Sequence, residues 1–466
     1  STSSSGRYVA FQSDATDLVA GGSNGSMHIF VRDRQTPTTT QVSVDSAGNE
    51  ANAASSSPSI SSDGRYVAFE SDATNLLGVG NDNNAWPDIF VHDLQTGTTT
   101  RVSVYSDETE SIDPSNNPSI SSDGRYVAFA SGGELDLTAI EILMLFDVFV
   151  HDRDTDGDGI YDEPGAVSTI RMSEDSAGNE ANAASSSPSI SSDGRYVAFE
   201  SSATNLVPGF SNGLIHIFVH DRDTDGDGQY DEPGEVSTVQ VSVDSIGAEG
   251  IGGDSSSCSI SGDGRYVAFV SDATNLVGVG NDNNVSTDVF VHDRDTDGDG
   301  IYDEPGAVST VRVSVDSAGA AGDNTSTFPS ISGDGRFVAF ESDATNLVGV
   351  GNDNNVSTDV FVHDRDVDGD GIYDEPGAIS TVRVSVDSAG AEGNGNSNNP
   401  SISANGKSVI FESDADNLLG VGNDNNVAPD IFADDLQTGA GGDESDGDGN
   451  SGSGCFISTA ADGAVW

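Results

Sequence analysis

Four acidic segments of this chain share one spacing of aspartates and glycines, D-x-D-x-D-G-x-x-D-E. The first runs from Asp154 to Glu163, and its close copies begin at Asp223, Asp295 and Asp366. Carboxylates at every second position of a tight loop converge on one point, because glycine permits the sharp turn between them. Hard divalent cations take about six to eight oxygen ligands, and calcium tolerates an irregular arrangement of them better than magnesium does.

Calcium is therefore the cofactor that these loops predict. Without a cation, three or four carboxylates held so close together would repel one another strongly. The alternative is a set of acidic turns that bind no metal. Glu163 and Asp152 are candidates for an additional ligand in the first loop. The predicted metal ligands are four aspartates from each loop: Asp154, Asp156, Asp158, Asp162, Asp223, Asp225, Asp227, Asp231, Asp295, Asp297, Asp299, Asp303, Asp366, Asp368, Asp370 and Asp374.

These loops resemble the calcium loops of EF-hands and, more closely, those of thrombospondin type 3 repeats. They depart from the EF-hand pattern in both registers. Counting from Asp154, the position of the bidentate glutamate is taken by Gly165. Counting from Asp152 puts Glu163 there, but Gly159 then stands where an apolar residue is usual. We therefore take the loop to begin at Asp154.

The elements that must position the loops come from a repeated hairpin, read in one copy as SPSISSDGRYVAFES from Ser187 to Ser201. An Asp-Gly pair between two β-prone runs is a strong hairpin signal, since glycine tolerates the positive φ of such turns. Seven copies at regular spacing indicate a repeat architecture. The closing phenylalanines of the copies are Phe11, Phe69, Phe129, Phe199, Phe269, Phe340 and Phe411.

Each hairpin is followed by the same three features. In one copy they are a polar loop (Ser271 to Asn284), an apolar strand (Asp288 to Asp293) and an alternating strand (Thr310 to Asp316). Each unit is thus expected to hold four antiparallel strands, with the acidic loops between the third and the fourth. The predicted fold is all-β, a seven-bladed β-propeller of four-stranded antiparallel blades. An open array of the same units is the alternative.

The order S-x-S-x-DGR-YVAF, D-[IV]-F-V-H-D and T-x-R-V-S resembles the propeller repeats of the TolB translocation protein family, which are related to WD repeats. The resemblance covers residues 1–438. It implies a propeller that serves as a binding platform more often than as an enzyme.

Composition excludes several partners. The formal net charge is −61, from 78 acidic and 17 basic residues, of which Lys407 is the only lysine. Nothing here could neutralise a nucleic-acid backbone, so no nucleic acid is expected, and no apolar run is long enough to span a membrane. So acidic a surface favours a cation-rich medium that screens self-repulsion, and a surface that only keeps the protein soluble is the alternative. Two cysteines make no disulfide framework. The expected location is secreted or at the cell surface.

The chain is expected to divide into a propeller (1–438), a flexible acidic Gly/Ser linker (439–454) and a C-terminal strand (455–466). The seventh unit lacks an outer strand of its own. Residues 455–466 are expected either to close the ring in cis or to insert into a neighbouring molecule. Cys455 to Gly463 resembles the short C-terminal CFIATAAYG box of some bacterial exported proteins, with Asp462 in place of its tyrosine.

Unit 3 differs from the others between Gly132 and Phe146, where Leu137, Ile140, Leu143 and Met144 fit one side of a short helix. Residues 135–146 are either a loop folded onto their own blade or an apolar patch for a partner or second subunit. The GNDNN stretches, such as Asn81 to Asn84, read as Asx turns or as further cation sites.

No enzyme is predicted. The five histidines of the FVHD strands recur in five blades, whereas an active site needs one asymmetric constellation; they are His92, His151, His220, His292 and His363. We expect a non-catalytic, calcium-stabilised extracellular propeller that acts as a structural or assembly module, in one version a subunit of a surface fibre. A monomeric protein- or glycan-binding propeller is the alternative, and a carbohydrate-active enzyme is the third.

Overall fold

The computed structural model describes most of the chain, and the account below concerns those residues. They are 1–78, 80–84, 86–133, 135, 145–209, 212–278, 284, 286–349, 351–420 and 428–436, together with the backbone of Cys455–Ile457. The linker 439–454 and the segment 136–144 of unit 3 lie outside the described residues, so the predictions for them stay open.

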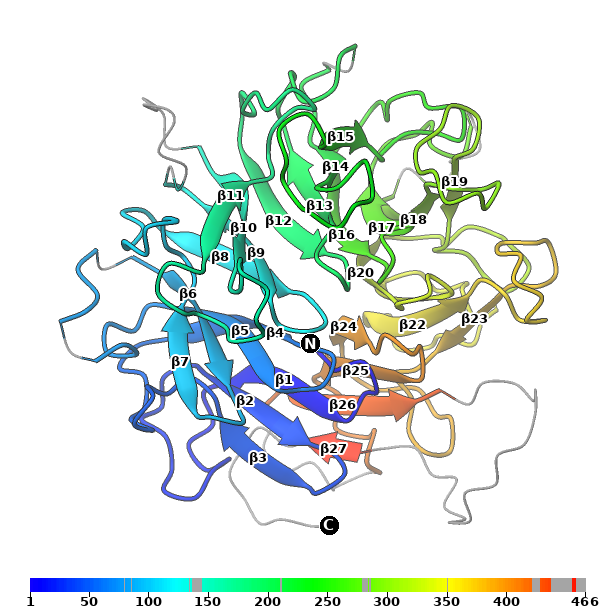
Figure 1. Ribbon diagram of the computed structural model, residues 1–466. Helices are drawn as coiled ribbons and strands as arrows, with labels where there is room; N and C mark the ends of the chain where they lie inside the picture. Colours follow the sequence, from blue (N-terminus) through cyan, green and yellow to red (C-terminus); the bar gives the residue numbers. More distant parts are fainter. Residues whose placement is uncertain are drawn as a thin grey trace.

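The described residues form seven antiparallel sheets arranged around a central axis, which is a seven-bladed β-propeller as predicted (Figure 1). Strands follow one another outward from the axis in chain order within each sheet. No helix occurs in the described part of the chain, and accordingly none there is long and apolar enough to cross a membrane.

Blade 1 holds β1 (Tyr8–Ser13), β2 (His28–Asp33) and β3 (Thr38–Gln41). Blade 2 holds β4 (Ser55–Ile60), β5 (Tyr66–Ser71), β6 (Asp88–Asp93) and β7 (Thr98–Arg101). Blade 3 holds β8 (Ser115–Ile120), β9 (Tyr126–Ser131), β10 (Asp147–Asp152) and β11 (Ser168–Arg171). Blade 4 holds β12 (Ser185–Ile190), β13 (Tyr196–Ser201), β14 (His216–Asp221) and β15 (Ser237–Gln240).

Blade 5 holds β16 (Ser255–Ile260), β17 (Tyr266–Ser271), β18 (Asp288–Asp293) and β19 (Ser309–Arg312). Blade 6 holds β20 (Ser326–Ile331), β21 (Phe337–Ser342), β22 (Asp359–Asp364) and β23 (Ser380–Arg383). Blade 7 holds β24 (Ser397–Ile402), β25 (Ser408–Ser413), β26 (Asp430–Asp435) and β27 (Cys455–Ile457). In blade 7, the C-terminal strand β27 pairs antiparallel with β26 of the same chain.

The innermost strand of each complete blade carries a bulge at its third residue. In blade 4 the pairing of β12 with β13 shifts register between Ser186 and Ser189, and Ser187 has a φ of 51°. The bulge turns the strand at the crowded centre, where serines leave room for it. The equivalent residues have φ values between 50° and 53°: Ser57, Asn117, Ser187, Ser257, Phe328 and Asn399.

A closed ring of backbone hydrogen bonds joins the seven inner hairpins. The N–H of Ser62 donates to the Ser122 carbonyl at 3.0 Å, and that of Ser122 donates to Ser192 at 3.0 Å. The series continues through every blade until Asn405 N–H donates to Ser4 at 3.1 Å. Backbone hydrogen bonds therefore close the ring between the last blade and the first.

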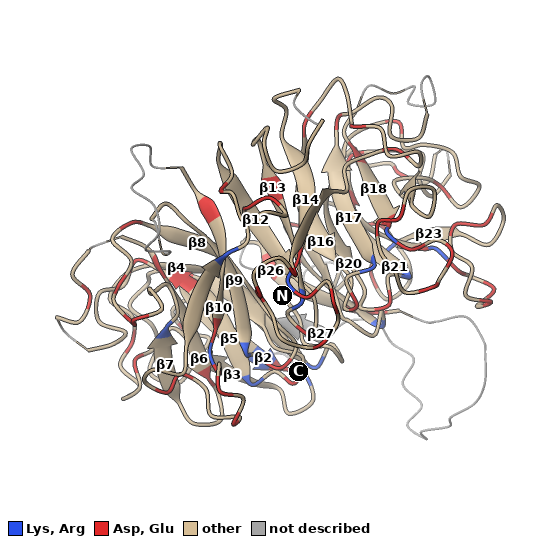
Figure 2. Ribbon diagram, turned by 45° about the horizontal axis from the view of Figure 1, so that its top comes forward, with Lys and Arg blue, Asp and Glu red and all other residues tan. Residues whose placement is uncertain are grey.

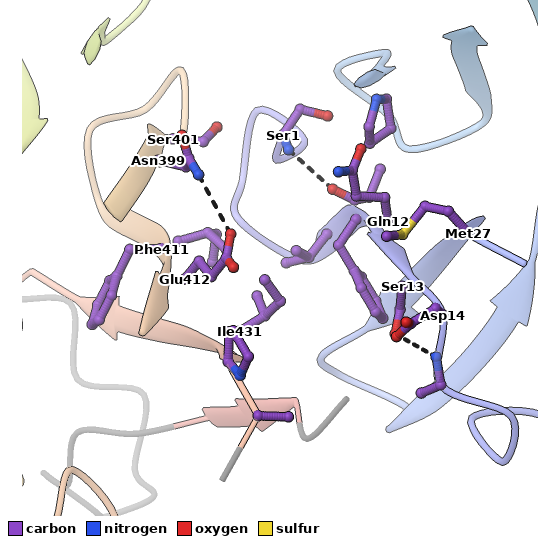
Figure 3. Close-up of a pocket in the computed structure, with 18 of the residues that line it drawn as sticks. Ser1, Gln12, Ser13, Asp14, Met27, Asn399, Ser401, Phe411, Glu412 and Ile431 are labelled. Carbon is purple, nitrogen blue, oxygen red and sulfur yellow. Dashed lines mark hydrogen bonds between the residues drawn. The ribbon is translucent and has the colours of Figure 1, made fainter. Parts of the chain in front are cut away.

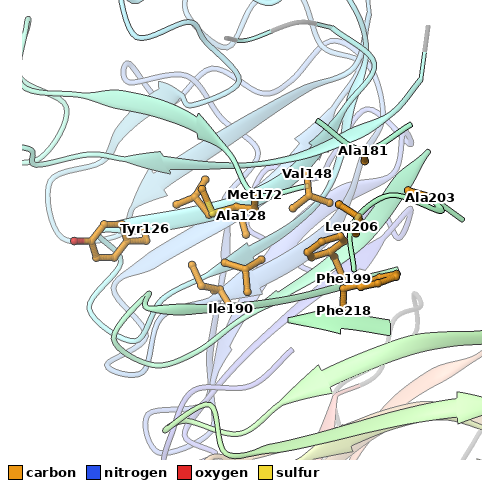
Figure 4. Packing of buried hydrophobic residues seen from close by; sticks show 12 residues of the cluster. Tyr126, Ala128, Val148, Met172, Ala181, Ile190, Phe199, Ala203, Leu206 and Phe218 are labelled. Carbon is orange, nitrogen blue, oxygen red and sulfur yellow. The ribbon is translucent and has the colours of Figure 1, made fainter. Parts of the chain in front are cut away.

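Apolar side chains form separate clusters between successive blades, and they do not form one common core. Between blades 3 and 4, Tyr126 and Ala128 belong to the same cluster as Val197 and Phe199 (Figure 4). The alternate residues of β13, such as Ala198, pack against blade 5. This is why the YVAF run is apolar without interruption: both of its faces are covered.

The outer strands are shorter than the sequence analysis predicted. The strand expected over Thr310 to Asp316 ends at Arg312. Beyond it, Val313 N–H donates to the Val289 carbonyl, and the Ser314 hydroxyl binds Asp288 at 2.7 Å. These bonds draw the chain inward across the adjacent strand, so Val313 and Val315 are buried as loop residues.

The tight packing of hairpin glycines against the preceding blade gives a first prediction. A Cβ on Gly194 would lie 2.2 Å from the Tyr126 ring, whereas one on Gly178 would meet nothing within 4 Å, although both residues have positive φ. Gly178→Ala should cost about 1–2 kcal/mol for its φ alone. Gly194→Ala should cost about 1–3 kcal/mol more, because the ring must move. Urea unfolding of both variants measures the difference, and equal losses would contradict the packing described.

Candidate metal centres

The first aspartate of each acidic loop is buried and fixes the loop backbone. In blade 4 one Asp223 carboxylate oxygen accepts hydrogen bonds from the N–H groups of Gly226 at 2.9 Å and Asp227 at 3.1 Å. The other accepts from Gly228 at 3.0 Å. Carboxylates at the same place in the other three loops accept equivalent bonds: Asp154, Asp295 and Asp366.

The second and third aspartates converge on the first, as predicted. Within a loop, one carboxylate oxygen from each of the three acids lies within 4.8 Å of the other two, for example in Asp223, Asp225 and Asp227. The same holds for Asp154, Asp156 and Asp158, and for Asp295, Asp297 and Asp299. The later two acids of each of these sets are exposed, so a cation can approach from solvent.

Negative charge is crowded in the blade 4 loop. Desolvation, a hydrogen bond shared with Asp223 and the nearby charges of Asp227 and Glu235 raise the pKa of the Asp225 carboxyl. A cation among the three carboxylates would remove this repulsion. The donor set of convergent carboxylate oxygens on a glycine-containing turn therefore fits a hard divalent ion such as calcium.

The fourth predicted ligand of each loop lies elsewhere, in an ion pair. Asp231 receives a bidentate contact from the buried Arg222 at 2.9 and 2.5 Å. In the loops of blades 3, 4 and 5 the structure thus brings together three of the four predicted aspartates, and in all four loops the fourth lies at an arginine. The four pairs are Arg153 with Asp162, Arg222 with Asp231, Arg294 with Asp303 and Arg365 with Asp374.

Of the two additional candidates in the first loop, Asp152 has its carboxylate engaged. Asp152 holds Arg125 in a bidentate contact at 2.7 and 2.8 Å and accepts the Asp154 N–H at 3.0 Å. The backbone carbonyl of Glu163 accepts the Ala166 N–H at 3.0 Å, which closes the end of the loop and leaves the Glu163 carboxylate, the predicted ligand group, out of this bond.

Each of the four arginines is clamped between two tyrosines from neighbouring blades. The Arg222 guanidinium lies 4.8 Å from the ring centre of Tyr126 in blade 3 and 4.9 Å from that of Tyr230 in its own loop. It also donates to the Gly194 carbonyl at 2.8 Å. Arginine stacked on aromatic faces and paired with a carboxylate suits a buried interface. The acidic loop is therefore anchored at the contact between two blades.

Two of the blade contacts without the acidic insertion are built differently. Between blades 1 and 2, Leu94 and Tyr8 both pack against the same apolar cluster. Between blades 7 and 1, Arg34 binds Asp435 at 2.9 Å and lies beside Ser408, which stands where other blades have an aromatic residue. The sequence analysis missed the contacts of the acidic loops, in which an arginine lies between two tyrosines and pairs with the fourth aspartate. Their signal was present, because an arginine precedes every acidic loop and a tyrosine stands before its fourth aspartate.

A second kind of acidic cluster lies on the face of the propeller opposite the acidic loops. The positive charge in this cluster is an arginine side chain. Asp82, Asp88 and Glu110 lie within 4.8 Å of one another. Arg101 donates to Asp88 at 3.1 Å and to Glu110 at 2.6 Å. Burial nevertheless raises the pKa of Asp88 to about 6. Asp353, Asp359 and Glu392 form the same arrangement around Arg383.

The GNDNN stretch beside the Arg101 cluster contains the Asx turns expected of it. Asn84 N–H binds the Asp82 carboxylate at 3.3 Å, and Trp86 N–H binds the Asn84 side chain at 2.7 Å. A metal at this place would have to displace a guanidinium. The loops that carry Asp154 and its equivalents are the better candidate centres.

The five repeated histidines are part of the framework. Each Nδ1 meets a threonine hydroxyl of the outer strand, at 2.9 Å between His220 and Thr238. That hydroxyl donates to a carbonyl of the preceding blade, which for Thr238 is Glu174 at 2.5 Å. Burial lowers the pKa of His151, His220, His292 and His363 to about 4, so these rings are neutral near pH 7.

No protein-family model matches the chain, and no curated protein matches it. Solved structures do resemble it. TolB from Acinetobacter baumannii aligns over 92% of this chain and 77% of its own, with 15% identity and a TM-score of 0.37. An oligogalacturonate lyase in complex with manganese aligns over 94% and 88%, with 13% identity and a TM-score of 0.47.

A puromycin-hydrolyzing peptidase from Mycobacterium tuberculosis aligns over 98% of this chain and 52% of its own, with 12% identity and a TM-score of 0.49. The solved structures that resemble this chain thus include both TolB proteins and enzymes. Likenesses of this size concern the fold alone.

The clamped arginines give a second prediction. Arg222→Met leaves Asp231 unpaired in a nearly buried site, so the variant should lose about 3–5 kcal/mol of unfolding free energy. Asp231→Asn added to it should restore part of the loss. Arg34→Met is the control, since the partner that it leaves unpaired, Asp435, has a side chain that is 61% exposed, against 8% for Asp231. Chemical denaturation at fixed calcium compares them, and equal losses for the two arginines would refute the burial argument.

Proposed function

We propose that this protein is a non-catalytic, extracellular propeller in which four acidic loops bind calcium and stiffen the contacts between blades. The observation that carries the proposal is the convergence of three carboxylate oxygens within 4.8 Å in loops anchored at blade contacts. The role that fits such a molecule best is a structural or assembly module, used where calcium is abundant.

Calcium binding and blade packing are physically coupled in this proposal. The same loop carries the three carboxylates and, a few residues later, the tyrosine and aspartate that enclose the buried arginine, as in Tyr230 and Asp231. Neutralising the exposed carboxylates removes the repulsion that would open the loop. The arginine clamp then stays closed over the preceding blade.

Binding of a protein or glycan on the face that carries the Arg101 and Arg383 clusters is the second candidate. Size-exclusion chromatography of the full chain and of a chain lacking residues 439–466 separates the two roles. An assembly module that polymerises through its C-terminal strand would lose its oligomers on truncation. A ligand-binding monomer would elute identically in both forms. An enzymatic role has the least support, because the repeated histidines are buried and neutral.

Calcium removal gives the third prediction. Each site at a calcium concentration of about 100 times its Kd would add about 2.7 kcal/mol to the free energy of unfolding. Excess chelator should therefore lower the melting temperature by several degrees, and calcium, more than magnesium, should restore it. Asp225→Asn with Asp227→Asn should reduce the calcium stoichiometry, measured by calorimetric titration, by one site.

Asp17→Asn is the control for charge alone, because Asp17 is an exposed residue of blade 1, which has no acidic insertion. It should leave the stoichiometry unchanged. A melting temperature and a protease resistance that are both indifferent to the chelator would exclude calcium stabilisation.

A further inference from the structure

Two histidines on the face of the Arg101 cluster have surroundings unlike those of the five repeated histidines. His28 begins β2 of blade 1 and His216 begins β14 of blade 4, where the other five blades have an aspartate. The ring Nε2 of His28 lies 3.1 Å from a Glu50 carboxylate oxygen, and that of His216 lies 3.2 Å from one of Glu249. Both rings are buried, so each blade holds an imidazole and a carboxylate together inside the fold.

The position that holds an arginine in blade 2 holds a glutamine in these two blades. In blade 2 the Arg101 guanidinium joins Asp88 to Glu110, at 3.1 and 2.6 Å. The same register position is Gln41 in blade 1 and Gln240 in blade 4. Blades 1 and 4 therefore keep the glutamate and lack the guanidinium beside it.

Other glutamates of the propeller have donors that cannot bind a metal. Glu412 meets the side-chain amide of Asn399 at 3.4 Å (Figure 3), and Glu200 accepts the Ser257 N–H at 2.6 Å. Amide nitrogens and guanidinium groups donate hydrogen bonds but have no lone pair to offer. A neutral imidazole does have one, so the histidine beside Glu249 adds a chemistry that these contacts lack.

Blades 1 and 4 differ in whether the glutamate already has a donor. In blade 1, Gln41 Nε2 donates to Glu50 Oε1 at 3.2 Å. In blade 4, Gln240 Nε2 lies instead at Ser242, 3.4 Å from both its carbonyl and its hydroxyl oxygen. Glu249 Oε1 and Gln240 Oε1 are both buried, and neither accepts a hydrogen bond from the described residues. Buried acceptors without a donor are costly, so a positive charge would be favoured there.

The His216 ring is held in place through its other nitrogen. Nδ1 lies 3.0 Å from the Ser242 hydroxyl oxygen, which also accepts the Ile217 N–H at 3.1 Å. Histidines that bind metals usually have their second ring nitrogen fixed in this way. Burial lowers the pKa of the His216 ring, so the ring is neutral near pH 7. With its proton on Nδ1, where Ser242 can accept it, the ring presents the Nε2 lone pair.

Two oxygen atoms lie around Nε2 at the spacing of metal ligands. Asn212 Oδ1 is 2.9 Å from His216 Nε2 and Glu249 Oε1 is 3.2 Å from it. Atoms bound to one zinc ion at about 2.0–2.2 Å lie about 3–3.5 Å apart. Asn212 is exposed, so an ion can reach Nε2 from solvent when this side chain turns. Asp254 adds a second negative charge near the ring.

We propose that blade 4 binds one divalent transition-metal ion, such as zinc, through His216 Nε2, Glu249 and Asn212, with water completing the coordination. An imidazole among oxygen ligands favours such an ion over calcium or magnesium, which prefer oxygen alone. The ion supplies the positive charge that Arg101 supplies in blade 2. This site contains none of the aspartates of the acidic loops, so it stands or falls separately from the proposed function.

Calorimetric titration of the full chain with zinc chloride, in calcium at a concentration that saturates the acidic loops, tests the proposal. One zinc ion per chain should bind at this site. His216→Asn should remove it, whereas His28→Asn should leave it unchanged, because Gln41 already donates to Glu50 in blade 1. Glu249→Gln should weaken binding about tenfold or more, since it removes the charged ligand. The comparison of the two histidine variants holds whatever the acidic loops bind.

A double substitution controls for loss of the fold. His216→Asp with Gln240→Arg rebuilds in blade 4 the arrangement of Asp359 and Arg383 in blade 6, so this variant should keep its melting temperature and lose the zinc site. The proposal is overturned if the original chain binds no zinc at about 0.1 mM free ion, where a site with a micromolar Kd is nearly full. Equal zinc binding by the original chain and the double variant, or equal losses in the two histidine variants, would overturn it too.

Discussion

Pairing of arginine with carboxylates decides where this very acidic chain can bury charge. Among the residues that the structure describes, every arginine except Arg32 forms an ion pair with an aspartate or glutamate, and Arg32 donates to Thr39. With 17 basic residues against 78 acidic ones, most acids must do without such a partner. They are seen mainly in the loops around the sheets (Figure 2).

This constraint sorts the acidic clusters into two kinds. Clusters on one face enclose a guanidinium, as Asp88 and Glu110 enclose Arg101. The loops on the other face use their arginine for a single aspartate and leave three carboxylates converging without a basic residue among them. Repulsion among these carboxylates destabilises the folded state unless counter-ions offset it. The proposed calcium ions would bind among the carboxylates that have no arginine as a partner.

The sequence was sufficient to predict the blades, because their pattern is local. An Asp-Gly turn and an uninterrupted YVAF run specify a hairpin covered on both faces, and the central strand of each unit has the predicted bounds, as in Asp288–Asp293. Three aspartates of each loop were also predictable, since alternate positions of a tight turn must converge. The outer strand was predicted too long, because a period-two pattern does not reveal that Ser314 turns the chain inward.

Contacts between blades could not be predicted in the same way. The fourth aspartate of each loop was assigned to the metal because sequence spacing alone does not show that the adjacent arginine reaches back to it. Nor does spacing show that a tyrosine from the previous blade covers that arginine, as Tyr126 covers Arg222. Such contacts join residues about a hundred positions apart, here 126 and 222. The recurring arginine and tyrosine of each loop mark the residues involved, but which blade they contact follows only from the closed ring.

An X-ray structure of crystals grown in calcium, with anomalous scattering used to locate the metal, tests the account most directly. We expect an anomalous peak in each of the four acidic loops, about 2.3–2.6 Å from carboxylate oxygens of the first three aspartates. The fourth aspartate should stay on its arginine, as Asp231 does on Arg222. Loops without a peak at saturating calcium, or a metal bound by Asp231 in place of its arginine, would contradict the account.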